Sequence, residues 1–271
     1  MATTSLQDKG VIVTGGASGI GLAVVNFFAT NSSKIAILDI SETSAVSVLA
    51  DLKTQYPGVT FTFKKCDIGD WDNQKQVFEE VYKEFGSIDV VFANAGITER
   101  GDFVKEMGEE PAKPVLKTVD INLYGTLYSV KLAIHYMRKN TSAHKGSIIC
   151  TASNAGLYAF PMAPMYAASK AAIIQAVRSM APVLEADGIT INAIAPAVIK
   201  TGLADAHLFQ NMILTPVSTA VSAIKDFSTQ PNLSGKVAEI SGEKYTIRDQ
   251  QPFVDQDTKA NLDTFSSLGH A

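Results

Sequence analysis

The sequence has few cysteines and no long apolar run, and each shortage excludes a class of protein. Its only two cysteines, Cys66 and Cys150, form no CxxC pair, and none of the four histidines stands at metal-ligand spacing. We therefore predict two buried free thiols and no metal centre. No apolar run reaches the roughly 18 residues that a transmembrane helix needs, and the first ten residues do not resemble a signal peptide. We expect a cytoplasmic protein without a membrane partner.

Clusters of basic residues are also absent. The formal net charge is -4, and lysine and arginine gather in no single stretch, so nucleic acid is not an expected partner. Hydrophobic residues make up 46% of the 271 residues and charged residues 18%, which is typical of a folded globular protein. The length fits one large α/β domain or two small ones.

Short apolar runs alternate with segments of helical periodicity along the chain. The runs VIVT, IAILD and DVVFAN are apolar at consecutive positions, as in the strands of a parallel sheet that helices cover on both faces. We predict further helices near 118–138 and 164–185, a helix ending near 227, and strands GSIICTAS, ITINAIAP and GKVAEIS. Seven strands joined by right-handed crossovers favour one doubly wound domain over two domains.

A glycine-rich turn follows the first predicted strand, in the segment TGGASGIG. Gly15 permits a tight turn, Gly19 allows close approach of a ligand, and Gly21 allows close packing of helix and strand. Such a glycine-rich turn can also occur where no ligand binds. Here strand, loop and helix follow in the required order, which favours a dinucleotide pyrophosphate at the start of the helix.

Asp39 ends the second predicted strand, where a carboxylate can accept hydrogen bonds from the adenosine ribose. It would also repel a 2′-phosphate, and neither Ala17 and Ser18 nor Ile40 and Ser41 supply a base for one. NAD is therefore favoured over NADP. Alternatively, Asp39 only caps the next helix.

Tyr166 and Lys170 are four residues apart and share one face of the helix predicted near 164–185. Ser153 lies thirteen residues before Tyr166 and follows a predicted strand. A Tyr/Lys pair is commonly a solvated helix face, and a serine after a strand is commonly a turn residue. The combination is more informative than either part.

The combined motifs resemble the short-chain dehydrogenases/reductases over nearly the whole chain. TGGASGIG fits that family's TGxxxGxG, Asn94-Ala95-Gly96 fits its NAG element, Ser153 stands at the usual distance before Tyr166-Ala167-Ala168-Ser169-Lys170, and Asn122 opens the helix that completes the tetrad. The segment GKVAEISGEKYTIRDQQPF is most similar to the last strand and tail of 15-hydroxyprostaglandin dehydrogenase relatives. Two positions depart from the family's pattern, Ala93 before NAG and Ala197 after the turn proline, and Ala197 would shift the backbone that meets the nicotinamide.

The resemblance implies a single Rossmann domain, a seven-stranded parallel sheet of order 3-2-1-4-5-6-7. Residues 1–250 would form the catalytic domain, with a substrate loop near 197–215, and residues 251–271 a polar tail. Cys66 and Cys150 would then lie about 19 Å apart at ~4.8 Å per strand, too far for a disulfide. A homodimer or homotetramer is implied as well. The implied cofactor-binding residues are Gly15, Ser18, Gly19, Ile20, Gly21, Asp39, Ile40, Asp67, Ile68, Asn94, Ala95, Gly96, Tyr166, Lys170, Pro196, Ile199 and Thr201.

The implied catalytic residues are Asn122, Ser153, Tyr166 and Lys170. Tyr166 would exchange the substrate hydroxyl proton, with its pKa pulled below the usual value of ~10 by Lys170 and the positive nicotinamide. Ser153 would orient the substrate oxygen, and Asn122 would hold a water that links Lys170 to solvent. The alternatives are a Ser/Lys hydrolase, which lacks a GxSxG elbow here, and a relative that uses bound nucleotide for a non-redox role, as a cyclase, isomerase or binding module.

Two mostly apolar segments follow Ser153 and Thr201. Their side chains fit either a substrate cleft or the core and a subunit interface. As a cleft they predict a medium-sized apolar secondary alcohol or ketone, such as a lipid, terpenoid or polyketide of secondary metabolism. The residues are Leu157, Tyr158, Phe160, Met162, Met165, Leu203, Leu208, Phe209 and Met212.

Overall fold

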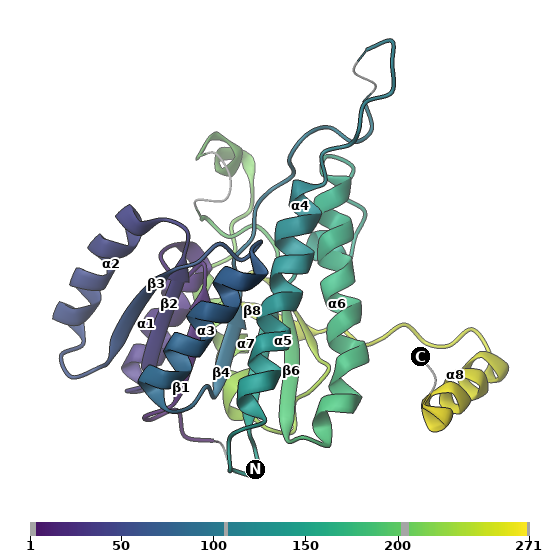
Figure 1. Cartoon of the computed structure of the whole chain (residues 1–271). Helices are drawn as coiled ribbons and strands as arrows, with labels where there is room; N and C mark the ends of the chain where they lie inside the picture. Colours follow the sequence, from purple (N-terminus) through teal and green to yellow (C-terminus); the bar gives the residue numbers. More distant parts are fainter. Residues whose placement is uncertain (1–3, 106–107, 202–205, 270–271) are drawn as a thin grey trace.

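The computed structural model describes residues 4–105, 108–201 and 206–269. These residues contain one eight-stranded sheet of order β3-β2-β1-β4-β5-β6-β7-β8 (Figure 1). The strands are β1 Gly10–Thr14, β2 Lys34–Asp39, β3 Phe61–Lys65, β4 Val90–Ala93, β5 Gly146–Thr151, β6 Ile189–Pro196, β7 Val237–Ser241 and β8 Lys244–Ile247. The first seven are parallel in the predicted order. The added strand β8 pairs antiparallel with β7, because Gly242 turns the chain back with φ 59°.

Helices cover both faces of the sheet, which explains why its strands are apolar at consecutive positions. All five residues of β1 are buried, and they alternate between two hydrophobic cores. Ile12 lies in the core under α3, α5 and α6, whereas Val11 and Val13 lie in the core under α1, α2 and α7 (Figure 1). The helices are α1 Gly19–Thr30, α2 Glu42–Gln55, α3 Trp71–Phe85, α4 Lys117–Val119, α5 Thr126–Met137, α6 Pro164–Glu185, α7 Val217–Thr229 and α8 Gln256–Leu268.

The helix predicted near 118–138 runs without a break over 117–137, but it is not α-helical throughout. A π-helical segment, Asp120–Gly125, separates α4 from α5. The cause is tertiary: a Cβ at Gly125 would lie 2.8 Å from the carbonyl oxygen of Ile68, and the Gln74 side chain of α3 donates to the Gly125 carbonyl at 2.9 Å. The widened turn thus accommodates α3 and the segment between β3 and α3.

The segment 251–271, predicted as a polar tail, contains α8. Asp255 caps this helix by accepting a hydrogen bond from the Thr258 N–H at 2.7 Å. No residue of α8 is buried, and the helix projects away from the sheet domain (Figure 1). Across the described ranges, no helix has the length and apolar character that crossing a membrane requires.

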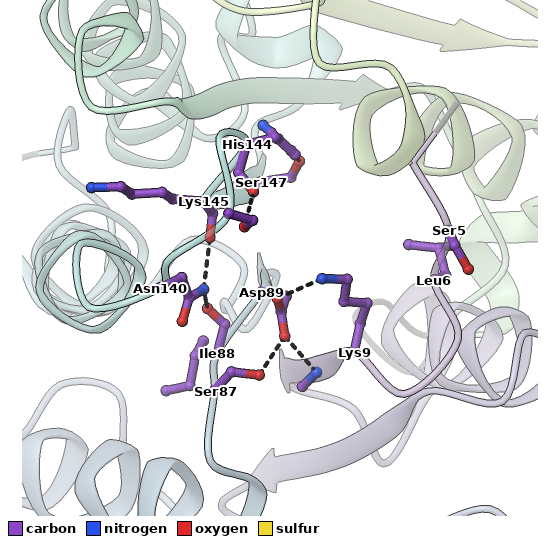
Figure 2. Close-up of polar contacts among 12 residues, drawn as sticks. Ser5, Leu6, Lys9, Ser87, Ile88, Asp89, Asn140, His144, Lys145 and Ser147 are labelled. Carbon is purple, nitrogen blue, oxygen red and sulfur yellow. Dashed lines mark hydrogen bonds and ion pairs between the residues drawn. The ribbon is translucent and has the colours of Figure 1, made fainter. Parts of the chain in front are cut away.

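The amino-terminal ends of the central strands are joined by polar contacts (Figure 2). Asp89, just before β4, accepts hydrogen bonds from Lys9 Nζ at 3.1 Å, the Gly10 N–H at 2.9 Å and Ser87 Oγ at 2.6 Å. His144 Nε2 lies 3.1 Å from Ser147 Oγ. The contacts of Asp89 join the starts of β1 and β4 at the end opposite the candidate site, and the His144 contact lies at the start of β5.

Candidate active site

A cavity of about 340 Å³ opens along the carboxyl ends of β1 to β5. In a doubly wound sheet this edge, where the strand order reverses between β1 and β4, is where ligands bind. Five residues that line the cavity were not predicted: Leu38, Cys66, Ile97, Ile121 and Thr151. Leu38, Cys66 and Thr151 lie at or next to the carboxyl ends of strands, and this position in the sequence would have identified them. The predicted cofactor residues in the lining are Gly15, Ser18, Gly19, Ile20, Asp39, Ile40, Asp67, Ile68, Asn94, Ala95, Gly96, Tyr166, Lys170 and Thr201.

Three predicted cofactor residues lie outside this lining. Gly21 faces the loop instead, since a Cβ there would meet the Gly15 carbonyl oxygen at 2.1 Å. Pro196 is the last residue of β6, and Ile199 is 7% exposed in the core under α1, α2 and α7. A contact of Pro196 or Ile199 with a nicotinamide therefore stays a prediction, whereas Thr201 of the same loop reaches the cavity.

The glycine-rich loop has the backbone that an anion site requires. Gly15 and Gly19 have φ of 63° and 53°, a conformation that side chains disfavour. A Cβ at Gly15 would lie 3.0 Å from Cα of Ala95, and a Cβ at Gly19 would lie 3.1 Å from Cβ of Thr201. Helix α1 starts here without a side-chain cap at Ser18 and without an acid in its first turn, so its first N–H groups can meet a phosphate. The loop fits a pyrophosphate.

The Asp39 carboxylate lies at the end of β2 and lines the cavity. One oxygen accepts from the Ala17 N–H at 3.1 Å and the other from the Ser41 N–H at 3.0 Å. Ser41, not Asp39, caps α2 by accepting from the Ser44 N–H. Asp39 therefore joins the glycine-rich loop to β2 and retains acceptor capacity toward the cavity.

Asn94 holds the ends of three strands together below the cavity. Its side-chain amide donates to the Thr14 carbonyl at 3.1 Å, and its Oδ1 accepts from Thr151 Oγ1 at 3.1 Å. Its N–H lies 2.9 Å from Thr14 Oγ1. The NAG element thus fixes the floor of the site by joining β1, β4 and β5.

Tyr166 and Lys170 project from one face of α6 into the cavity. Burial raises the pKa of the Tyr166 phenol above its usual value and outweighs hydrogen bonding with Ser153, which lowers it. The direction is opposite to the predicted lowering by Lys170, because the phenol is largely removed from solvent. Lys170 is 3% exposed, and its Nζ donates to the Thr151 carbonyl at 2.8 Å and lies 5.6 Å from the centre of the Tyr166 ring. Burial lowers the pKa of Lys170 from 10.5 to about 8. The arrangement places the Tyr166 phenol near both a hydroxyl and a buried amine.

Asn122 is fully buried within the π-helical segment and does not line the cavity. Its Oδ1 accepts from the Ile97 N–H at 2.8 Å, and its Nδ2 donates to the Ile97 carbonyl at 2.9 Å. The side chain thus clamps the segment after β4. Its expected hold on a water stays a prediction.

Several predicted rim residues are solvent-exposed. The exposed ones are Tyr158, Phe160, Met162 and Met212; Leu157, Met165 and Phe209 are half-buried. Leu203 and the Leu208 side chain lie outside the described residues. Tyr158 donates its hydroxyl to Glu239 at 3.1 Å.

Comparison with known proteins identifies the family to which the chain belongs. The model of a family described as short chain dehydrogenase matches residues 9–210. The chain is 36% identical over 209 residues to short-chain dehydrogenase/reductase ATR7 of Stachybotrys chlorohalonatus, covering 75% of this chain but only 60% of that protein. It is 30% identical over 225 residues to 2,5-dichloro-2,5-cyclohexadiene-1,4-diol dehydrogenase of Sphingobium indicum, covering 83% and 86%. The solved structure of levodione reductase is similar with a TM-score of 0.77 at 23% identity, covering 87% and 97%.

Proposed function

Since the chain belongs to the short-chain dehydrogenase family, we propose that it is an NAD(H)-dependent oxidoreductase that interconverts a secondary alcohol and its ketone. The observation that carries this proposal is that the Tyr166 and Lys170 side chains line one cavity, with Lys170 Nζ 5.6 Å from the centre of the Tyr166 ring. Hydrogen bonding with Ser153 lowers the pKa of the same phenol. These groups supply proton exchange, substrate orientation and charge stabilisation, which alcohol oxidation needs.

The bound nicotinamide would accept the hydride in oxidation and supply it in reduction. Tyr166 would take the hydroxyl proton of an alcohol, and in reduction it would give that proton back. The Lys170 ammonium would favour the phenolate of Tyr166 and would hold the nicotinamide ribose. Ser153 Oγ, which accepts from the Ala155 N–H at 3.2 Å, would fix the angle of the substrate oxygen. Asn122 would support the segment that lines the cavity beside them.

NAD is the proposed cofactor because of the charges at the adenosine end. Asp39 supplies a carboxylate there, and among the described residues that line the cavity Lys170 is the sole cation. Lys65, the register partner of Asp39 on β3, is bound to Glu42 at 2.9 Å. A 2′-phosphate would thus meet a negative charge without a free base to offset it.

An apolar substrate of medium size is the proposed class. The exposed side chains of Phe160, Met162 and Met212 belong to the segments that follow Ser153 and Thr201, and a cleft formed by them would favour desolvation of an apolar body. A relative named for a chlorinated cyclohexadiene diol is consistent with a cyclic apolar alcohol.

We further propose that the protein is cytoplasmic and forms a homodimer or homotetramer. Small residues such as Ala168 and Ala171 on the exposed side of α6 would allow close contact between helices of two subunits.

The test is a substrate panel followed by the absorbance of reduced nicotinamide. Apolar cyclic secondary alcohols should be oxidised with NAD, and polyols of similar size should be poor substrates. A clear preference for polyols would mean that the apolar side chains serve an interface. Nucleotide binding without turnover of any alcohol or ketone would favour the non-redox alternative, and ester hydrolysis without nucleotide would favour the hydrolase.

A further inference from the structure

Helix α6, which carries Tyr166 and Lys170, lacks a cap of its own. Its N-cap residue is Ala163, which has no side-chain acceptor. Pro164 follows and has no N–H to satisfy. The first hydrogen bond of the helix runs from the Ala167 N–H to the Ala163 carbonyl at 3.0 Å. The N–H groups of Met165 and Tyr166 therefore have no partner within the helix.

Glu99, from the segment after β4, supplies both missing acceptors. Its Oε1 accepts from the Met165 N–H at 3.2 Å, and its Oε2 accepts from the Tyr166 N–H at 2.6 Å. The two residues are 66 and 67 positions away in the chain. A carboxylate at this end of a helix also interacts favourably with the helix dipole. Glu99 is thus a cap contributed from another part of the fold.

The backbone on both sides of Glu99 is fixed. Ile97 is clamped by the Asn122 side chain at 2.8 and 2.9 Å. Thr118 Oγ1 accepts from the Arg100 N–H at 2.8 Å and donates to the Thr98 carbonyl at 3.2 Å. Because Ile97 lines the cavity, Glu99 joins the wall of the cofactor site to the first turn of α6.

We infer that Glu99 is a positioning residue that holds Tyr166 in register with the cofactor and with Ser153. The inference rests on the proposed function, since it assumes that the Tyr166 phenol exchanges the proton. Tyr166 is only the third residue of α6, and helix ends without a cap fray. Without Glu99 the first turn would loosen, and the phenol would leave its productive position in part of the molecules. Glu99 acts through the backbone of Met165 and Tyr166, because each of its carboxylate oxygens accepts one of these N–H groups.

Two variants test this role, Glu99→Ala, which removes both acceptors, and Glu99→Gln, which keeps one carbonyl oxygen. The matched control is Asp89→Asn at the opposite end of the sheet, where a carboxylate also accepts from a backbone N–H, that of Gly10 at 2.9 Å. Each is assayed as the full chain for the single-turnover rate of hydride transfer, for the Kd of NAD, and for hydrogen exchange of peptides spanning 163–170.

For Glu99→Ala we expect the single-turnover rate to fall at least about tenfold, because small displacements of catalytic groups cost up to ~100-fold. The Kd of NAD should stay within about twofold, and the Met165 and Tyr166 amides should lose protection from exchange. Glu99→Gln should lie between wild type and Glu99→Ala. Asp89→Asn should lower the thermal midpoint and leave the rate unchanged at a temperature where it is folded.

The inference is overturned if Glu99→Gln and Glu99→Ala keep the wild-type rate while losing stability, or if amide protection at 163–170 does not change. Should Glu99→Ala not fold, the Glu99→Gln rate decides the question. Failure of the proposed function is a separate result, because a Tyr166→Phe variant with normal turnover would remove the proton-exchanging role whatever Glu99 does.

Discussion

Asp39 should set the cofactor preference, and its effect can be worked out from the charges at the site. Hydrogen bonds between its carboxylate and ribose hydroxyls contribute about 1.5–3 kcal/mol with NAD. With NADP, unit charges about 4 Å apart repel by about 1 kcal/mol in water-like surroundings and about 4 kcal/mol near a protein surface. The lower values of the hydrogen-bond contribution and of the repulsion sum to about 2.5 kcal/mol. This free-energy difference predicts a preference for NAD over NADP of roughly 70-fold in kcat/KM.

Replacement of Asp39 by alanine should reduce this preference by at least about tenfold. The variant also loses the acceptors of the Ala17 and Ser41 N–H groups, so kcat/KM should fall with both cofactors. The ratio is therefore the quantity to measure, as kcat/KM for NAD and NADP with one alcohol. Ser41→Ala is the control, since it removes the cap of α2 and should leave the ratio unchanged. An NADP preference in the wild type, or an unchanged ratio in Asp39→Ala, would refute the reasoning.

Three further predictions concern titratable groups. Burial lowers the pKa of Lys170 from 10.5 to about 8. Its charge therefore destabilises the cofactor-free fold at pH 7 by on the order of 3 kcal/mol. This penalty is relieved as pH rises from about 8 toward 10.5, where the folded protein releases the proton before the unfolded chain does. Lys170→Met should thus raise the thermal midpoint at pH 7 while abolishing turnover; a lower midpoint would contradict this. Burial raises the pKa of both Cys66 and Cys150 to about 12, so neither thiol should react with a thiol reagent at neutral pH until the protein is unfolded, and labelling of the native protein would be the contrary result. Burial lowers the pKa of His144 below 6.5, so the unfolded chain binds the proton first and stability is lost as pH falls below about 6.5. Between about pH 7.5 and pH 5.5 the thermal midpoint of the wild type should therefore fall more than that of His144→Asn. An equal fall of the thermal midpoint in both proteins would exclude His144 as the cause.

Features that depend on local pattern could be predicted from the sequence. Consecutive apolar residues identified the parallel strands, and Pro164 at the first turn helped to place α6, whose bounds Pro164–Glu185 match the prediction. The glycine-rich turn before α1 and the place of Asp39 at the end of β2 could also be predicted, because they follow from the local order of strand, turn and helix. Each of these signals is contained in a short stretch of the chain.

Features that depend on distant partners could not be predicted. The π-helical segment Asp120–Gly125 contacts Ile68 and Gln74, which lie more than 45 positions earlier in the chain. Glu99 is charged and adjacent to the NAG element, yet only the fold reveals that the start of α6 lies against it. Strand β8 was missed because its short sequence KYTI is only half-buried at an edge, which leaves little apolar signal.

The most direct test of the account is the turnover of Tyr166→Phe with NAD and an accepted alcohol. The change deletes one hydroxyl and keeps the ring, so the Kd of NAD should stay within about twofold while kcat falls at least about 100-fold. Tyr56→Phe, which removes a hydroxyl bound to Asn26 at 3.1 Å, should keep wild-type kcat. Near-normal oxidation by Tyr166→Phe would contradict the assignment of Tyr166 as the group that exchanges the substrate proton.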